Sequence, residues 1–336
     1  MEPINHAMEP RRWAEVHFGE APLTDVRRVE RLKTIAEALA ANPGASIPQL
    51  FARPYDVKAA YSFFNHPEVG PETVQSAHRA GVLEQLEAAG TYVLMEDTTE
   101  LDWTGRAPIP GLGPIGNHRE GVQGVRLHSV LAARWPEGAT SGEDGRRPVV
   151  ELIGLCDQQY QRRTPRPVGE AKGASAARKK RNRDSQRGSW ASERIGAAPA
   201  GRAVRWVRVG DAEADSYEHL QGCQAKGHGY VIRAGQDRAL IEADGRTAVG
   251  YLFETVRRAP ALGQFAVELY PRPGAPVRLA ELSVSALPVR LRAPQRPGAG
   301  VGSLPPIECT ASRGCGKPSR RPGGRRWNGF CCAMPR

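Results

Sequence analysis

Residues 206–233, WVRVGDAEADSYEHLQGCQAKGHGYVIR, give the clearest indication of the fold class. Its first five residues are a mostly apolar run that predicts a strand ending at Asp211. Ser216 to Lys226 is typical of a helix, and the run from Tyr230 to Arg233 predicts a further strand. A strand, a helix and a strand in succession indicate an α/β arrangement.

Three more strands are expected before this unit. The first is the apolar run at 92–95, and the other two are RLHSVLAARW at 126–135 and PVVELIGLCDQQY at 148–160. Residues 161–203 follow and are rich in Arg, Lys, Ala, Gly and Pro, so we expect a mobile basic insertion with one short helix near 185–195. This order of elements is compatible with a ribonuclease-H-like core over residues 91–237.

The segment after this core has a different pattern of apolar and polar residues. Residues 238–309 alternate between apolar and polar and contain Pro/Gly turns, as in FAVELYPRPG at 265–274 and PVRLAELSVSALPVRLRAP at 276–294. Such alternation predicts an antiparallel β insertion.

Residues 1–90 are expected to form a small helical bundle. Apolar residues recur at three- and four-residue steps on one helix face: Leu23, Val26, Val29, Leu32, Ile35 and Leu39. A second short helix is expected to open at Ser46 and Pro48, and further helices are expected at 56–64 and 73–89. A bundle with basic faces can contact DNA phosphates, and the candidate DNA-binding residues are Arg27, Arg28, Arg31, Lys33 and Lys58. The segment nevertheless holds nine Lys/Arg against twelve Asp/Glu.

Charge and length restrict the function classes. The 336 residues suggest two domains, and the net charge of +11 favours an anionic partner such as nucleic acid. The positive charge is concentrated at 161–194 and 310–336, and the alternative reading is two solvated basic runs. No apolar stretch reaches the ~18 residues of a membrane span, and the N-terminus lacks the apolar region of a signal peptide. We therefore expect a cytoplasmic protein without membrane partners, with reduced cysteines.

Two carboxylates carry the expected chemistry. Asp97 follows one predicted strand and Asp211 ends another, and strand ends of one sheet lie close together. Carboxylates at such a point bind Mg²⁺ or Mn²⁺, and a pair of these metals can activate water in phosphodiester cleavage. The alternative is that Asp97 merely caps the following turn.

An ordered set of motifs resembles the Tn5-like transposases of the IS4 family. The resemblance covers about residues 10–308, and its motifs keep the family's order: DVRRVER at 25–31, NPGASIP at 42–48, KAAYSFFNHPEV at 58–69, EDTTELDW at 96–103, GLGPIGN at 111–117, LHSVLA at 127–132 and VGDAEADSYEHL at 209–220. The resemblance implies an N-terminal domain that binds double-stranded DNA at transposon ends. It also implies a ribonuclease-H-like core with a β insertion, a DDE metal triad and a homodimer that acts on DNA.

The resemblance assigns roles to single residues. Asp97 matches the first catalytic and metal-binding acid and Asp211 the second, although Ala212 stands where the family usually has Arg. Arg233 matches a basic position that contacts DNA, and Arg238 is expected to assist it. Asp215 is expected to support the start of the following helix, and His128 is read as a packed strand residue rather than a catalytic one.

The third acid of the triad is missing from the expected place. The family carries it as a Glu on a helix after the β insertion, whereas residues 311–336, ASRGCGKPSRRPGGRRWNGFCCAMPR, contain no Asp or Glu. We expect 310–336 to be a disordered basic tail, read out of frame, that leaves the core incomplete at its C-terminus, exposes apolar sheet surface and lacks the dimerisation region. Three hypotheses remain: an active transposase, a non-catalytic DNA-binding remnant or competitor of an intact transposase, and an unrelated nuclease of the same fold.

Overall fold

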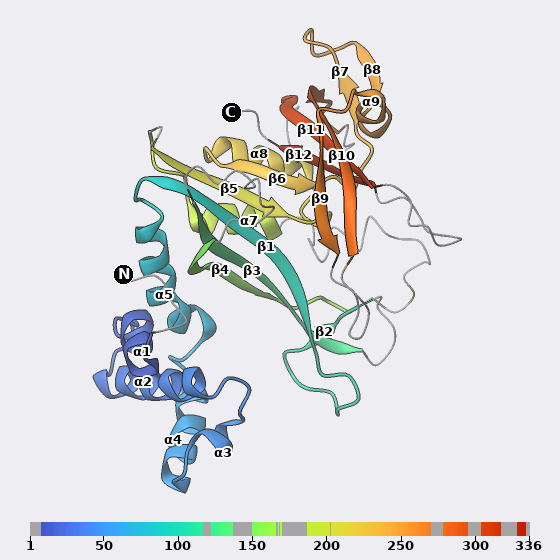
Figure 1. Ribbon diagram of the computed structural model, residues 1–336. Coiled ribbons are helices and arrows are strands. Elements are labelled where there is room, and N and C mark those ends of the chain that lie inside the picture. The colour runs from blue at the N-terminus through green and yellow to red at the C-terminus, as the bar shows by residue number, and fades with distance from the viewer. Residues whose placement is uncertain are drawn as a thin grey trace.

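The computed structural model describes residues 8–116, 122–136, 150–165, 167, 169, 187–201, 203–269, 278–294, 304–316 and 328–333. A helical N-terminal part precedes a sheet-rich part (Figure 1). The α/β fold class with N-terminal helices therefore agrees with the expectation.

The N-terminal part consists of helices that pack around a small apolar core. They are α1 (Pro10–Phe18), α2 (Val26–Ala41), α3 (Ile47–Leu50), α4 (Pro54–Phe64) and α5 (Pro71–Gln85). Asp25 caps α2 by accepting a hydrogen bond from the backbone N–H of Arg27 at 2.9 Å, and the Pro residues that open α4 and α5 suit a first helical turn. The buried side chains between α2 and α4 include Leu32, Ile35, Ala60 and Phe63.

The central sheet has two kinds of strand pair. Its strands are β1 (Gly90–Asp102), β2 (Gly113–Pro114), β3 (Gln123–Trp135), β4 (Glu151–Gln161), β5 (Val204–Gly210) and β6 (Gly229–Arg233). β1 pairs antiparallel with β3, which pairs antiparallel with β4, and β1 also pairs parallel with β5, which pairs parallel with β6. The main order is thus β4-β3-β1-β5-β6. The two-residue strand β2 pairs antiparallel with the first residues of β3.

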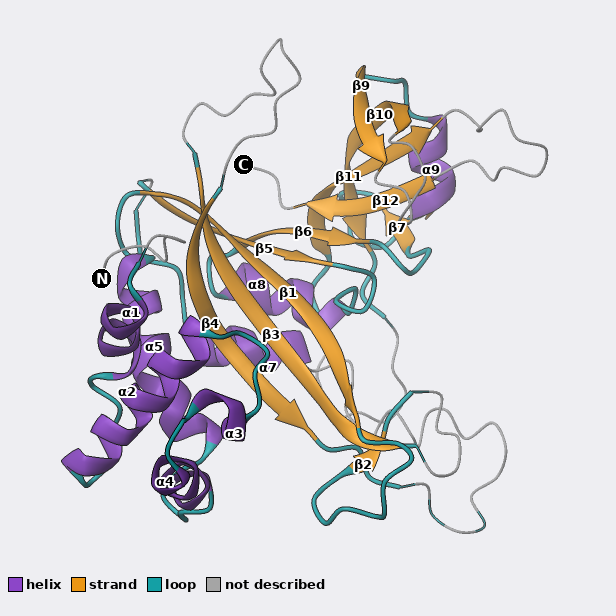
Figure 2. Cartoon of the chain, turned by 60° about the horizontal axis from the view of Figure 1, so that its bottom comes forward, coloured by secondary structure: helices purple, strands orange, loops and turns teal. Residues whose placement is uncertain are grey.

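Two helices cover one face of this sheet (Figure 2). They are α7 (Arg187–Ile195), close to the short helix expected in the basic insertion, and α8 (Tyr217–Ala225), which Ser216 caps. The core beneath them includes Leu94, Ala191 and Trp206. Residues 170–186 of the expected mobile insertion lie outside the described residues.

The strand that contains Asp97 is longer than expected. We expected it to end beside Asp97, but β1 continues to Asp102 because β3 pairs with it as far as Gly124. Its parallel partner β5 ends at Gly210, opposite Glu96. Asp97 therefore lies inside a strand, at the level where the parallel pairing ends.

The helical part docks on β4 through α5. The φ of Gly154 is +153°, and a Cβ there would lie 2.7 Å from Val82 Cγ2 and 2.8 Å from His78 Cε1. The backbone N–H of Leu155 donates a hydrogen bond to His78 Nε2 at 3.0 Å. The closeness of the backbone explains why only glycine fits at 154 without a shift of these neighbours.

The segment after β6 is largely antiparallel, as its alternation predicts. It contains β7 (Ala239–Ile241), β8 (Ala248–Tyr251), β9 (Gly263–Leu269), β10 (Arg278–Leu291) and β11 (Ile307–Gly316). β10 pairs antiparallel with both β9 and β11. A helix that the sequence pattern did not predict, α9 (Leu252–Arg258), packs here through the buried Leu252 and Val256.

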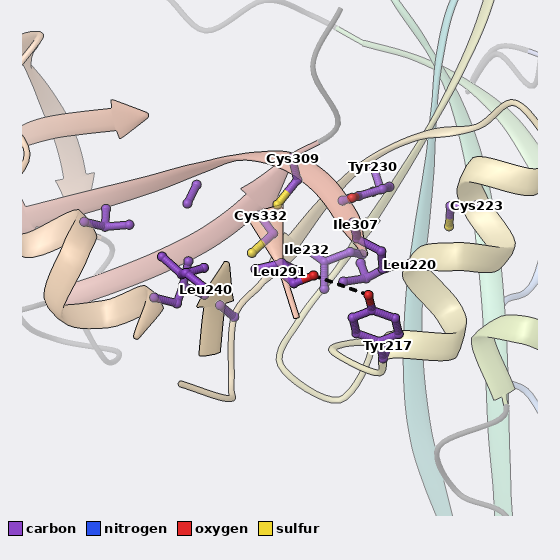
Figure 3. Packing of buried hydrophobic residues seen from close by; sticks show 14 residues of the cluster. Tyr217, Leu220, Cys223, Tyr230, Ile232, Leu240, Leu291, Ile307, Cys309 and Cys332 are labelled. Atoms are coloured by element: carbon purple, nitrogen blue, oxygen red, sulfur yellow. Dashed lines mark hydrogen bonds between the residues drawn. The ribbon is translucent and has the colours of Figure 1, made fainter. Parts of the chain in front are cut away.

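The expectation of a structureless tail from residue 310 is wrong for two segments. β11 extends to Gly316, and β12 (Asn328–Ala333) pairs with both β11 and β6. Cys309 and Cys332 point into an apolar cluster with Ile232 and Leu291 (Figure 3). The Arg- and Gly-rich composition gives this short strand little sequence signal. β11 pairs with all of β12, and β6 pairs with its last three residues. Residues 317–327 and 334–336 lie outside the described part.

The sheet face opposite α7 and α8 carries apolar side chains that are only partly buried. Alternation along β1, β5 and β6 places Val93, Met95, Val207, Val209 and Val231 on this face. Val231 is 40% exposed. Within the described residues, no helix is long and apolar enough to cross a membrane.

Candidate nucleic-acid interface and carboxylate pair

The predicted DNA-binding residues of α2 are engaged in ion pairs of the helical part. Arg28 pairs with Glu68 at 2.7 Å, Arg31 with Asp56 at 3.3 Å, and Lys33 with Glu15 and Glu30, each at 2.6 Å. Arg27 is 88% exposed and pairs with Asp25 at 3.0 Å, across its own helix start. These ion pairs occupy Arg and Lys side chains of α2 that were predicted to contact DNA phosphates, and most of them link α2 to neighbouring segments. Exposed ion pairs contribute only about 0–1 kcal/mol, so they can exchange for phosphate contacts.

The outward face of α4 has a different character. Tyr55, Lys58 and Tyr61 recur at three-residue steps, and all three are exposed, with Tyr55 at 72% and Tyr61 at 48%. Lys58 makes no ion pair within the described residues. Helix α4 lies at the outer end of the helical part in both views (Figures 1 and 2). A cation flanked by exposed aromatic rings suits contact with phosphates and bases.

Helix α4 presents this face because its other residues are fixed inside. Ala60 and Phe63 are buried against α2, and Asp56 accepts hydrogen bonds from both Arg31 and Arg53. With a period of 3.6 residues, this inward anchoring leaves the side of Tyr55, Lys58 and Tyr61 free for solvent or a partner. We refer to these three residues as the α4 outward face.

The structure brings the two predicted acids into one row. Glu96, Gly210 and Ile232 are in register across β1, β5 and β6. One residue further along each strand stand Asp97, Asp211 and Arg233, all of them exposed. Neighbouring strands are about 4.8 Å apart, so Asp97 and Asp211 stand at adjacent positions of this row, and Arg233 follows beyond Asp211 on β6.

Each acid has a local backbone contact that orients it. The backbone N–H of Thr98 donates to Asp97 Oδ1 at 2.8 Å, and that of Glu213 donates to Asp211 Oδ1 at 2.7 Å. These contacts leave the second carboxylate oxygen of each acid available. Mg²⁺ is commonly held by one or two carboxylates together with waters and substrate phosphates, and this donor set fits that pattern. No group of three or more His, Cys, Asp or Glu suited to a metal occurs among the described residues.

A buried ionic cluster lies behind the pair. Glu96 accepts a hydrogen bond from Arg208, and His219 Nε2 lies 2.6 Å from Glu96 Oε1. Burial disfavours the charged form of Glu96, but Arg208 and His219 outweigh it and hold the pKa of the carboxyl well below its usual range. Burial likewise opposes protonation of His219, yet the charge of Glu96 raises the pKa of this imidazole to about 9.

The remaining predicted residues support the same region. His128 Nδ1 lies 3.0 Å from Thr98 Oγ1 and the ring is buried, which agrees with the packed-strand reading. Asp215 accepts hydrogen bonds from the backbone N–H groups of Gly235 and Gln236 and pairs with Arg238 at 2.5 Å. The structure thus places Arg238 against Asp215, holding the loop after β6, rather than in an open position toward DNA.

Sequence reasoning missed the α4 outward face beyond Lys58, as well as Glu96, Arg208 and His219. For α4, the signal was present as aromatic residues at three-residue steps on the solvent side. For the cluster, the signal was Arg208 at an inward position of an apolar strand, where a charge requires a buried partner. That partner could not be identified from the sequence.

The comparison with known families concerns the helical part. Residues 10–69 match the family model described as transposase DNA-binding. The matched segment contains α1 to α4, and with them both the ion-paired residues of α2 and the α4 outward face. Helices α1 to α4 are thus similar to the DNA-binding region of transposases, and this match supports a DNA-binding role of the transposase type.

Proposed function

We propose that this protein is a Tn5-like member of the IS4 transposase family that binds double-stranded DNA at transposon ends and is itself defective in cleavage. The match of residues 10–69 to a transposase DNA-binding family carries the proposal. The α4 outward face, with Lys58 between two exposed tyrosines, supplies the contact surface. The protein acts on DNA in the cytoplasm, and a homodimer on DNA is part of the same proposal.

The sheet supports a ribonuclease-H-like catalytic core. Three antiparallel strands are followed by two strands parallel to the first, with α8 between them. Asp97 and Asp211 would hold Mg²⁺ or Mn²⁺ with their free oxygens, and the metal when bound would polarise a DNA phosphate and activate water. Arg233, in the same row, orients the DNA backbone beside the acids.

The defect in cleavage follows from the number of acids in the row. The carboxylates present there supply two of the three acids of a DDE triad, and the residues after Glu308 contain no Asp or Glu. The loss of one group that stabilises charge at the reacting phosphate costs about 10²–10³ in rate. An alternative function, supported by the same acid-free segment, is a non-catalytic remnant that competes with an intact transposase for DNA ends.

DNA binding is tested by fluorescence anisotropy of a labelled duplex with the full chain over a series of salt concentrations. We expect affinity to fall as salt rises, and Lys58→Ala to reduce the slope of log K against log[salt] by about 1. Arg258→Ala is a matched control because Arg258 is 78% exposed on α9 and lies outside the matched segment. Salt-independent binding, or equal losses in both variants, would contradict the proposal.

A further inference from the structure

The charge cluster behind the carboxylates is buried. Glu96 and Arg208 have side chains that are 1% and 0% exposed, and His219 is 1% exposed. Removing charges from water is costly even when they are paired, and an apolar replacement of similar volume is often as stable. Stability alone is therefore a poor explanation for three ionised groups at this depth.

The members of the cluster come from the elements that position the two acids. Glu96 precedes Asp97 on β1, and Arg208 lies three residues before Asp211 on β5. His219 lies on α8, which begins directly after the turn that follows Asp211. Arg208 also donates to Ser192 Oγ on α7 at 3.2 Å. The contacts of Glu96 and Arg208 thus join both strands to both covering helices.

Because side chains alternate along a strand, fixing Glu96 on the inner face also fixes the side to which Asp97 points. Gly210, opposite Glu96, leaves room for this arrangement. A Cβ at position 210 would lie 3.1 Å from Glu96 Oε1 and 2.7 Å from the Cβ of Ala214.

We propose that Glu96, Arg208 and His219 are positioning residues, which hold the ends of β1 and β5 so that Asp97 and Asp211 bind one divalent cation together. This inference rests on the proposed metal-binding function of the acid pair. Hydrogen bonds to ionised groups are directional and strong, whereas an apolar contact would permit the strand ends to slide. Outer-shell partners of this kind commonly change metal affinity by about 10–100-fold.

The test measures the Kd of Mn²⁺ for the full chain by electron paramagnetic resonance of free Mn²⁺, together with the thermal midpoint of each variant. The double variant Glu96→Met with Arg208→Met replaces the ion pair with apolar side chains of similar length. We expect it to keep a cooperative melt and to bind Mn²⁺ about 10–100-fold more weakly. Arg208→Lys keeps the charge but not the forked geometry, and we expect it to weaken binding as well; it serves as the second variant if the double variant does not fold.

The variant Asp97→Asn distinguishes a failure of the positioning role from a failure of the proposed metal site itself. If Asp97→Asn abolishes Mn²⁺ binding while a folded cluster variant binds like wild type, the positioning role is overturned and the metal site stands. If Asp97→Asn leaves Mn²⁺ binding unchanged, the proposed metal site is wrong, and the positioning role falls with it. A lowered melting midpoint with unchanged Kd would assign the cluster a purely structural role.

Discussion

Glu96 and Gly210 form the last in-register pair between β1 and β5, and the side chain of Glu96 occupies the space that a Cβ at 210 would enter. The contact couples the strand before one acid to the residue before the other. A glycine in a strand ordinarily weakens it, so its presence here is explained by the close approach of Glu96 and Ala214.

Gly210→Ala is predicted to destabilise the protein by about 1–3 kcal/mol, because the added methyl group overpacks against Ala214 and Glu96. Urea unfolding followed by circular dichroism measures the change. Gly222→Ala is the matched control, since its Cβ meets nothing within 4 Å inside α8. This control is expected to stabilise by about 0.5–1 kcal/mol. Equal stabilities of the two variants would refute the packing argument.

The contact between α5 and β4 is predicted to weaken as the pH falls. Burial, with a smaller contribution from His17, lowers the pKa of His78 to about 4, whereas an imidazole in the unfolded chain has a pKa of about 6.5. Between these values the unfolded chain binds the additional proton, so stability decreases as the pH falls from 6.5 to 4. The loss attributable to His78 is on the order of 2–3 kcal/mol.

The structure indicates why protonation cannot be accommodated at this position. His78 Nε2 accepts the hydrogen bond from Leu155, so the neutral ring carries its proton on Nδ1, which lies 2.8 Å from His17 Nδ1. His78→Gln keeps an acceptor and removes the titration. Chemical denaturation at pH 7 and pH 4.5 should show a smaller difference for this variant than for wild type. The residual difference is assigned to the other buried imidazoles, because burial also lowers the pKa of His17 and lowers that of His228 to about 4.

The partly exposed sheet face is predicted to bind hydrophobic dyes and to promote self-association. Val207 and Val209 lie on it, and Val231 is 40% exposed. A contiguous apolar surface of this kind is an association site. Val207→Thr with Val209→Thr should reduce the fluorescence of bound anilinonaphthalene sulfonate and shift sedimentation toward the monomer. A wild-type protein that is monomeric and binds no dye would contradict this prediction.

Cleavage by the chain is predicted to be very slow. With two acids in the row, nicking of supercoiled plasmid in the presence of Mn²⁺ should not exceed that of Asp97→Asn by more than about tenfold, because the missing charge costs 10²–10³ in rate. Gel electrophoresis of time courses measures it. Rapid nicking that Asp97→Asn abolishes would show that the defect does not exist.

The sequence predicted the order of helices and strands well because their periodicities are strong. The strands near 92–95, 126–135, 206–210 and 230–233 and the helix at 216–226 all occur, with longer bounds for β1. The length of β1 was not predictable, since residues 98–102 are polar and are kept in the strand only by pairing with β3. The tail strands were missed because β12 gains its partners from segments distant in the sequence.

The candidate site was predicted in part. Asp97, Asp211 and Arg233 were each named from motifs, and the register of three strands brings them to one row. The ion pairs of Arg28, Arg31 and Lys33 could not be predicted, because Glu68, Asp56 and Glu15 lie in other helices or in the turn before α5, and are brought near α2 only by folding. The contact between Arg238 and Asp215 could not be predicted for the same reason, because the two residues meet only in the folded protein.

DNA recognition by the N-terminal helices is tested by selection from a random duplex pool with the full chain, followed by sequencing of the bound fraction. We expect the wild-type protein to enrich one sequence, and the triple variant Tyr55→Ala, Lys58→Ala and Tyr61→Ala, altered on the solvent side of α4, to lose that enrichment. The Arg258→Ala control should enrich the same sequence as wild type. Failure of the wild-type chain to retain DNA, or identical enrichment by the triple variant, would contradict DNA recognition by the N-terminal helices through α4.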